Sequence, residues 1–238
     1  MTCGTLGTSQ PFSFQDAATR TLIGYDVDIC QLVADKLGVK VNFKLLSVAA
    51  RVPELNEKRV DILAANLGYS TERAQQISFS HIYYVTPQKL LVRADSNLTT
   101  VEQLNGRRVA ATKGSSSERE IKKRLENSQV IGYSDSSAAY LALQQKKVDA
   151  QFASELVLVR LMLQSPPTAP VTIMEKSVMD EPWGLGVRKD ETAFLDAVNG
   201  ILDEAEKSGE AAKIFDKWFG AETTYKLTRS FTIGPVTD

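Results

Sequence analysis

The chain has 238 residues, of which 43% are apolar and 24% are charged, a composition that excludes a disordered protein. Its 28 basic and 29 acidic side chains are interspersed and give a net charge of −1. No basic stripe therefore offers a nucleic-acid footprint, and no apolar run approaches the roughly 18 residues that span a bilayer.

The chain begins MTCGTLGTSQ, without the basic and apolar segments of a secretory leader, so its cellular address cannot be read from this end. Cys3 falls in a predicted first strand and Cys30 in the helix that follows. We interpret both as buried thiols in preference to a disulfide.

The first half of the chain alternates between helix and strand signals. Residues 26–37 predict a helix with one apolar face, which Gly38 ends. A strand at 39–45, a short helix at 52–57 and the apolar strand VDILAAN (60–66) follow. Such alternation predicts an α/β fold whose parallel sheet is covered on both faces.

A second series of elements begins after Asp95. Thr100 and Gln103 have the spacing of a capping box and predict a helix that reaches Leu104. The next elements are the strand RRVAAT, a helix that starts with the box Ser117/Glu120, the strand VIGY, a helix at 137–145 and the strand VDAQFAS.

The two series resemble each other. KRVDILAAN (58–66) and KKVDAQFAS (146–154) share a pattern and each follows a helix. We therefore predict two lobes, each a mostly parallel sheet flanked by helices, made of residues 1–93 plus 184–238 and of residues 94–183. KLLVRAD and WGLGVRK are the two hinge strands that join them, and ligands are expected beyond the carboxyl ends of the strands. We expect the two similar strands to lie in separate sheets.

The sequence offers little for catalysis. His81, the only histidine, sits among aromatic residues in FSHIYY and is interpreted as a packed or surface side chain rather than a base. No segment matches a calcium loop, a Walker loop or a dinucleotide fingerprint. We therefore expect neither a metal nor an organic cofactor.

Two segments suit an anion. Arg73 follows Ser70 or Thr71, either of which can cap a helix, and a cation is disfavoured in the first turn of a helix. Either a bound anion offsets that cost, or Glu72 and solvent do. In KGSSSERE (113–120), successive N–H groups and hydroxyls can cradle a carboxylate, or the serines simply cap the helix.

The motifs PFSF, IGYDVDICQLVADKLGVKV, KRVDILAAN, STERAQQISFS, KGSSSE, KKVDAQ and KWFG occur in this order. With them the chain resembles the type 2 periplasmic solute-binding proteins, and more narrowly the polar amino-acid-binding family of ABC importers (bacterial extracellular solute-binding proteins, family 3). The resemblance covers nearly the whole chain. It implies a two-lobed protein that closes on a small ligand.

The resemblance also implies site residues. Arg73 matches the arginine that holds the α-carboxylate of the ligand, and Gly68 matches a backbone N–H that joins it. Asn66 matches a further contact from the first lobe. Ser115 and Ser116 match the residues of the second lobe that meet the same carboxylate.

In many members of this family an acidic residue receives the α-ammonium of the ligand. This chain has Ser154 at that position. Glu155 is a poor substitute, because successive residues of a strand point in opposite directions. Amino acid remains the expected ligand, and a carboxylate without the amine stays open.

The positions where an aromatic ring often stacks on the ligand hold Ser9 and Val48. Arg51 matches an arginine of members that take acidic amino acids, but the partner position of that arginine is Leu6. A surface helix arginine is the preferred interpretation of Arg51.

The function implied by the resemblance is capture of a small carboxylate, foremost an amino acid, by hinge closure in the cleft between lobes. The partner would be the membrane permease of an ABC importer, the compartment the periplasm, and the protein a monomer that is not an enzyme. Two alternatives stay open: an enzyme of the cyclohexadienyl dehydratase type on the same fold, and a ligand-sensing ectodomain.

Overall fold

The computed structural model describes residues 1–236 and separates the chain into two compact units. Unit 1 comprises Met1–Leu46, Ala50–Val85 and the described residues from Pro182 onward, and unit 2 comprises Ser47–Ala49 and Thr86–Glu181. The change-over points differ by eight and two residues from the predicted boundaries at 93/94 and 183/184. The extents of the two lobes as moving bodies stay a prediction.

Two strands run from one unit into the other. They are β7 (Ser78–Arg93) and β12 (Met179–Val187), and they contain most of the predicted hinge segments, KLLVRAD and WGLGVRK. The predicted strand KLLVRAD corresponds only to the C-terminal end of β7. The observed strand is far longer, because the alternating burial of its residues continues through FSHIYYVT.

The elements of unit 1 are β1 (Thr2–Thr5), β2 (Thr8–Ser9), β3 (Ser13–Gln15), β4 (Leu22–Ile23), α1 (Tyr25–Lys36), β5 (Asn42–Leu45), α2 (Arg51–Asn56), β6 (Ile62–Leu63), α3 (Thr71–Ala74), α7 (Thr192–Ser208) and α8 (Glu210–Phe219). β1 pairs in parallel with both β5 and β6, and β12 pairs antiparallel with β6. β2, β3 and β4 form a separate antiparallel sheet.

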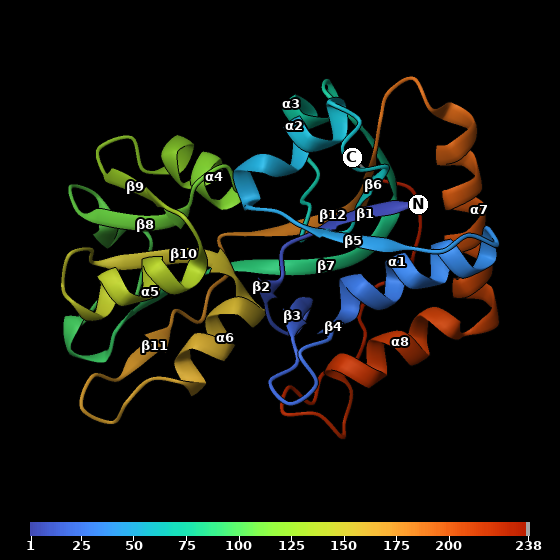
Figure 1. Cartoon of the computed structure of the whole chain (residues 1–238). Helices are drawn as coiled ribbons and strands as arrows, with labels where there is room; N and C mark the ends of the chain where they lie inside the picture. The colour runs from blue at the N-terminus through green and yellow to red at the C-terminus, as the bar shows by residue number, and fades with distance from the viewer. Residues whose placement is uncertain (237–238) are drawn as a thin grey trace. The chain divides into compact units, whose positions relative to one another are not determined.

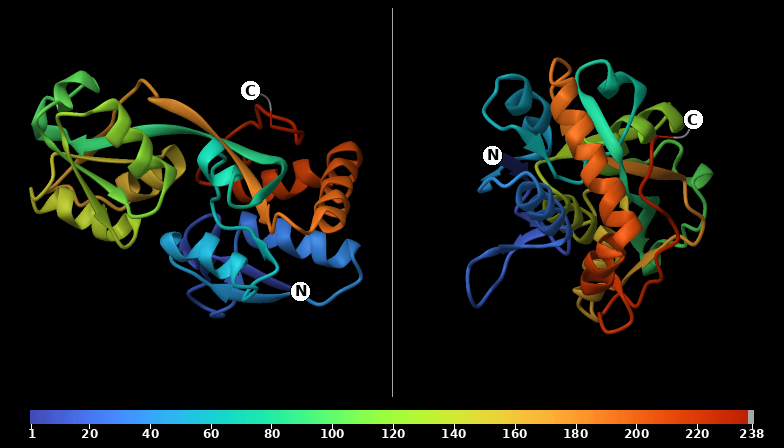
Figure 2. Two further views of the ribbon diagram at one scale, coloured as in Figure 1. Left: turned by 90° about the horizontal axis from the view of Figure 1, so that it is seen from above. Right: turned by 90° about the vertical axis from the view of Figure 1, so that its right-hand side faces the viewer.

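Helices α1, α7 and α8 pack against one another in unit 1 (Figures 1 and 2). Beneath them lies an aromatic core in which the ring centroids of Phe12 and Trp183 are 4.8 Å apart and those of Tyr25 and Phe219 are 5.1 Å apart. Such contacts add stability beyond simple burial of area.

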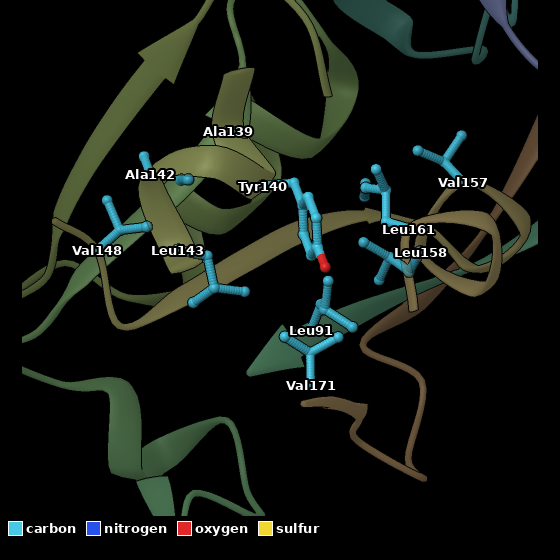
Figure 3. Packing of buried hydrophobic residues seen from close by; sticks show 12 residues of the cluster. Leu91, Ala139, Tyr140, Ala142, Leu143, Val148, Val157, Leu158, Leu161 and Val171 are labelled. Carbon is cyan, nitrogen blue, oxygen red and sulfur yellow. The ribbon is translucent and has the colours of Figure 1, made fainter. Parts of the chain in front are cut away.

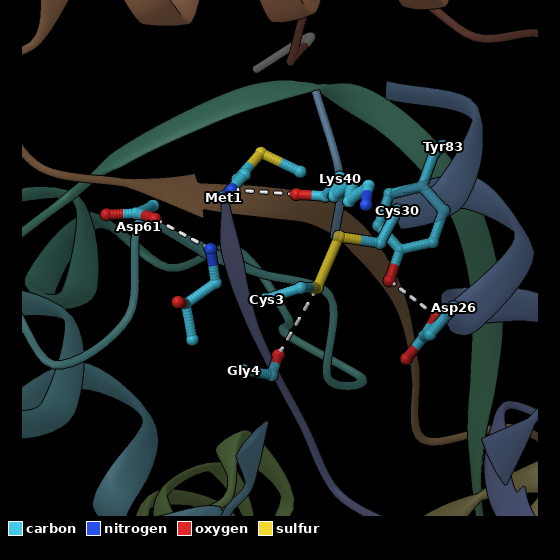
Figure 4. Close-up of a disulfide and its surroundings, with 9 residues drawn as sticks. Met1, Cys3, Gly4, Asp26, Cys30, Lys40, Asp61 and Tyr83 are labelled. Atoms are coloured by element: carbon cyan, nitrogen blue, oxygen red, sulfur yellow. Dashed lines mark hydrogen bonds between the residues drawn. A yellow bond between two sulfur atoms is a disulfide. The ribbon is translucent and has the colours of Figure 1, made fainter. Parts of the chain in front are cut away.

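A disulfide joins Cys3 of β1 to Cys30 of α1 (Figure 4). The expectation of two free thiols is wrong. The strand and the helix pack face to face, so the two buried residues have a Cα–Cα distance of 6.8 Å, within the range that a disulfide spans.

Unit 2 contains β8 (Arg108–Thr112), α4 (Ser116–Arg124), β9 (Gln129–Tyr133), α5 (Ser136–Gln144), β10 (Ala150–Ser154), α6 (Glu155–Leu163) and β11 (Val171–Ile173). β10, β8 and β9 are parallel neighbours, and β7 lies antiparallel to both β10 and β11. The expected helix at 100–104 is instead a 3₁₀ turn, Glu102–Leu104.

Both faces of the unit 2 sheet are buried, as the sequence predicts. Leu91 and Ala110 pack with α5 and α6 on one face (Figure 3). Their strand neighbours Leu90 and Val109 pack on the other face with Ile121 of α4. This alternation assigns each strand residue of unit 2 to a face.

The expectation that the two similar strands lie in separate sheets is wrong. Hydrogen bonding links them in one path of order β5-β1-β6-β12-β7-β10-β8-β9. The path is continuous because β7 and β12 belong to both units.

Candidate functional site

Arg73 lies in α3, and the hydroxyl of Ser70 caps this short helix by accepting a hydrogen bond from the Arg73 N–H (3.2 Å). The arginine side chain is only 5% exposed. Its Nη1 donates to the carbonyl oxygen of Gly68. The structure therefore brings Arg73 and Gly68 together, with the Gly68 carbonyl orienting the guanidinium.

Arg51 is buried, with 2% of its surface exposed, so its interpretation as a surface arginine is wrong. It is the first residue of α2, and its Nη1 donates to the carbonyl oxygens of Ala65 and Asn66, both at 2.7 Å. The loop that follows β6 turns both carbonyls toward the helix. Arg51 thus holds the loop that carries Asn66.

Asn66 adopts a left-handed conformation (φ 50°), which asparagine tolerates better than most residues. Its N–H donates to Oδ2 of Asp26 at 2.8 Å. Its side-chain Oδ1 is buried and accepts no hydrogen bond from any described residue. A buried polar atom without a partner calls for an explanation, and a ligand donor is one.

Asp26, which the sequence analysis treats only as part of a helix, is fully buried beside these residues. The Tyr83 hydroxyl donates to its Oδ1 at 2.7 Å (Figure 4). Burial raises the pKa of Asp26 to about 7, and the hydrogen bonds from Tyr83 and Asn66 and the charge of Arg51 oppose that rise. The sequence contains one signal for the burial of Asp26, which is its spacing. Asp26 precedes Ile29 by three positions and therefore lies on the apolar face of α1.

In unit 2 the three serines before and in α4 have different partners. Ser115 is the N-cap, and its hydroxyl accepts from the Glu118 N–H at 3.0 Å. The predicted cap at Ser117 is therefore two residues late. The Ser116 hydroxyl donates to Glu181 Oε1, and the Ser117 hydroxyl donates to Gln88 Oε1 at 2.7 Å.

Ser154 ends β10 and is 6% exposed. It lies directly opposite Gln88 in the antiparallel ladder, so the two side chains share a face of the sheet. Glu155 forms an ion pair with Lys89 (2.7 Å). The structure thus groups Ser116, Ser154 and Gln88 on the α4 side of unit 2.

Ser9 is half-buried at the end of β2, where it pairs with Ser13. Within residues 1–236, no hydrogen bond or ion pair joins Ser9 to Arg73 or Asn66. Its role as a ligand contact stays a prediction.

No group of three His, Cys, Asp or Glu side chains among the described residues is arranged to hold a metal ion. In the same part of the chain, no helix is long and apolar enough to cross a membrane.

Comparison with known proteins identifies the family. The family model of bacterial extracellular solute-binding proteins, family 3, matches residues 1–221. The glutamine-binding protein GlnH of a Bacillus subtilis ABC transporter is 28% identical over 211 residues, covering 87% of this chain and 76% of that protein. The L-cystine-binding protein TcyJ of Escherichia coli is 28% identical over 223 residues, covering 93% and 83%.

Solved structures of similar proteins support the same family. An ancestral arginine-binding protein bound to arginine has a TM-score of 0.87 at 32% identity and covers 92% of this chain and 98% of its own. An ancestral amino-acid-binding protein described as a precursor of cyclohexadienyl dehydratase has a TM-score of 0.83 at 27% identity, with coverage of 92% and 95%. The resemblance inferred from the sequence is thereby confirmed: the chain belongs to the bacterial extracellular solute-binding proteins, family 3.

Proposed function

We propose that this solute-binding protein captures a small α-amino acid, and that Arg73 holds the carboxylate of that ligand. The observation that carries the proposal is the pairing of Arg73 with the Gly68 carbonyl, which presents a buried guanidinium at a fixed orientation. A guanidinium binds a carboxylate through two parallel hydrogen bonds, which a lysine ammonium cannot reproduce.

Two further observations support an amino-acid ligand. Asn66 Oδ1 is a buried acceptor without a partner among the described residues, close in sequence to Arg73. The similar proteins are named as binders of glutamine, cystine or arginine. We propose that the Ser115 hydroxyl and the backbone N–H of Ser116, at the start of α4 in unit 2, add donors to the same carboxylate when the lobes close. We also propose that Asn66, Arg51 and Ser9 contact the remainder of the ligand.

We propose that the protein delivers its ligand to the membrane permease of an ABC importer and works in the periplasm. The Cys3–Cys30 disulfide supports this compartment, because disulfides persist in oxidising environments and are rare in the cytosol. Co-purification of the ligand-loaded protein with a permease encoded beside its gene tests the partner.

The first experiment is a thermal-shift screen of the common L-amino acids, L-cystine and small dicarboxylates. A ligand at about a hundred times its dissociation constant adds about 2.7 kcal/mol to the free energy of unfolding, which gives a readily measured shift. Calorimetric titration of the best ligand then follows, with the parent, Arg73→Ala, Arg73→Lys and the exposed control Arg124→Ala.

Arg73→Ala is expected to weaken binding by about 2 to 5 kcal/mol, or about thirtyfold to several thousandfold, because it leaves the ligand carboxylate desolvated and unpaired. Arg73→Lys is expected to lose much of the affinity as well, whereas Arg124→Ala should bind like the parent. A folded Arg73→Ala protein with parental affinity would rule out the carboxylate role of Arg73.

We propose that the protein binds its ligand without converting it. Incubation with a cyclohexadienyl acid, followed by chromatography of the products, tests this point. Loss of water and carbon dioxide from that acid at a rate above the uncatalysed one would establish the dehydratase alternative.

A further inference from the structure

The backbone of Asn66 is held from two sides by buried groups of opposite charge. Its carbonyl oxygen, like that of Ala65, accepts from Nη1 of Arg51 at 2.7 Å. Its N–H donates to Oδ2 of Asp26 at 2.8 Å. Asp26 is fully buried and Arg51 is 2% exposed, so these hydrogen bonds are made away from water and are stronger than the same bonds at a surface.

The conformation of Asn66 depends on these contacts. A residue other than glycine with φ of 50° lies in a sparsely populated region, and it stays there where its surroundings fix it. A rotation of this backbone would move the side chain together with the N–H and the carbonyl. Asp26 and Arg51 therefore also determine where Oδ1 of Asn66 lies, the buried atom that we propose to contact the ligand.

The hydrogen bonds on Asp26 distinguish its two protonation states. Oδ1 accepts from the Tyr83 hydroxyl at 2.7 Å. That hydroxyl can turn and accept instead, so Oδ1 can carry a proton. The Asn66 N–H has no such freedom, and with a protonated Asp26 it donates to a neutral carboxyl group. A hydrogen bond to an ionised acceptor is roughly twice as strong as a neutral one, so protonation of Asp26 weakens one of the contacts that fix Asn66.

Titratable and charged groups approach Asp26 from three elements. Arg51 of α2 supplies a positive charge, and Tyr83 comes from β7. Tyr25 precedes Asp26 in α1, and its hydroxyl donates to the Tyr83 carbonyl oxygen at 2.8 Å. Burial raises the pKa of both tyrosines, so they stay neutral at pH 7. Burial raises the pKa of Asp26 to about 7, so this carboxyl group exchanges its proton near neutral pH.

We propose that the ionised carboxylate of Asp26 positions Asn66 for the ligand, so that ligand binding releases a proton from Asp26. The proposal rests on the proposed function, since it assumes that Asn66 Oδ1 accepts a hydrogen bond from the ligand. A donor that approaches Oδ1 also brings partial positive charge to Asn66, which favours the ionised form of Asp26. Because the coupling between the two equilibria is reciprocal, ligand affinity should increase with pH.

Asp28 provides a matched control. It is the other acid in the first turn of α1. Its Oδ2 accepts from Lys217 Nζ at 2.6 Å and from Trp218 Nε1 at 2.7 Å, and both donors belong to α8. Asp28→Asn therefore removes an acid from the same turn and leaves the contacts of Asn66 intact, whereas Asp26→Asn keeps the shape of the group and removes its titration.

The test counts protons. The probe is the tightest-binding amino acid of the screen among those whose side chain does not titrate between pH 5.5 and pH 8. Calorimetric titrations at pH 7 in phosphate and in imidazole, two buffers with different enthalpies of protonation, give the number of protons released per ligand. Affinities are then measured from pH 5.5 to pH 8 for the parent, Asp26→Asn and Asp28→Asn. Titrations shared by these proteins cancel in the difference.

The parent is expected to bind more tightly as the pH rises. The difference between an ionised and a neutral acceptor corresponds to about fivefold in affinity, of which about fourfold falls between pH 5.5 and pH 8. The same coupling predicts the release of about a third of a proton per ligand at pH 7. Asp28→Asn should behave like the parent. Asp26→Asn should lose this proton release and keep the parental affinity of pH 5.5 at every pH.

A purely structural role of Asp26 gives a different result. Asp26→Asn would then weaken binding equally at every pH, and parallel profiles or equal proton release would overturn the proposal. A parent whose affinity does not change with pH overturns it without any variant. Tyr83→Phe is the second variant, because it removes a hydrogen bond that lowers the pKa of Asp26. The midpoint of its affinity profile should move to higher pH, and an unmoved midpoint would contradict the role of Asp26.

The remaining outcomes separate the role of Asp26 from the proposed function. Arg73→Ala reports on the carboxylate of the ligand. Weakened binding by Arg73→Ala together with unchanged proton release in Asp26→Asn overturns the role of Asp26 alone. Unaltered binding by Arg73→Ala with proton release that is lost in Asp26→Asn overturns the proposed carboxylate site alone. A parent that binds neither amino acids nor carboxylates overturns both.

Discussion

Asp26 makes the stability of this protein depend on pH in an unusual direction. Its pKa is raised from 3.8 to about 7 in the folded protein, mainly because it is fully buried. The folded state therefore binds a proton more tightly than the unfolded state between these two values. The contribution of Asp26 is complete below about pH 4 and is lost as the pH rises through about 7.

The size of the loss in stability follows from the rise in the pKa of Asp26. Each pKa unit corresponds to about 1.36 kcal/mol, so a rise of about three units corresponds to about 4 kcal/mol of unfolding free energy lost between pH 4 and pH 8. Asp26→Asn removes this titration. Its amide oxygen can accept from the Asn66 N–H while its NH₂ group donates to the Tyr83 hydroxyl, so both partners keep a hydrogen bond.

The assay is chemical unfolding of the parent and Asp26→Asn at several pH values from 4.5 to 8, followed by tryptophan fluorescence. Titrations shared by the two proteins cancel in the difference, and the exposed Asp196→Asn is the control for loss of an acid. Asp26→Asn should gain stability relative to the parent as the pH rises. Parallel curves, or a parent that gains on the variant, would refute the reasoning by showing that Asp26 is ionised in the folded protein at low pH.

Three further expectations concern the site and the scaffold. Ser154→Ala should weaken ligand binding by only about 1 kcal/mol, or about fivefold, because it removes at most a neutral hydrogen bond; calorimetry decides. The double variant Cys3→Ala/Cys30→Ala should lose about 3 to 4 kcal/mol in urea unfolding, the loop entropy for a sequence separation of 27. Treatment with EDTA should leave ligand affinity unchanged in calorimetry; affinity lost on chelation and restored by a divalent ion would contradict this.

Much of the fold could be predicted because its elements have strong local signals. The helix predicted at 26–37 is α1 (Tyr25–Lys36), and the strand of VDAQFAS is β10. The full length of β7 is harder to predict, because only its last third has the uninterrupted apolar pattern of a buried strand. Strand boundaries depend on the neighbouring chain to which each residue hydrogen-bonds, and that neighbour is not encoded locally.

The errors at single residues have a common physical cause, which is tertiary burial. Arg51 begins a helix of six residues, too short for a reliable apolar face, and its burial follows from two carbonyls of a loop fourteen and fifteen positions later. Cys3 and Cys30 lie in a strand and a helix, and such a spacing suits either two thiols or a disulfide. Only the packing of β1 against α1 decides between them.

The acids show why transferring roles position by position is incomplete. Transferring a role by sequence position tests only whether that position keeps the same kind of side chain. Ser154 does not, because many members of the family have an acidic residue there. A binding site requires a charge at a point in space, which a residue from another strand can supply. Glu181 is 27 positions after Ser154, yet Gln88 connects the two through one ladder pair and one hydrogen bond. Asp26 likewise reaches Asn66 across 40 positions. Contacts of this kind join residues that lie far apart in the sequence, so comparison of single positions does not reveal them.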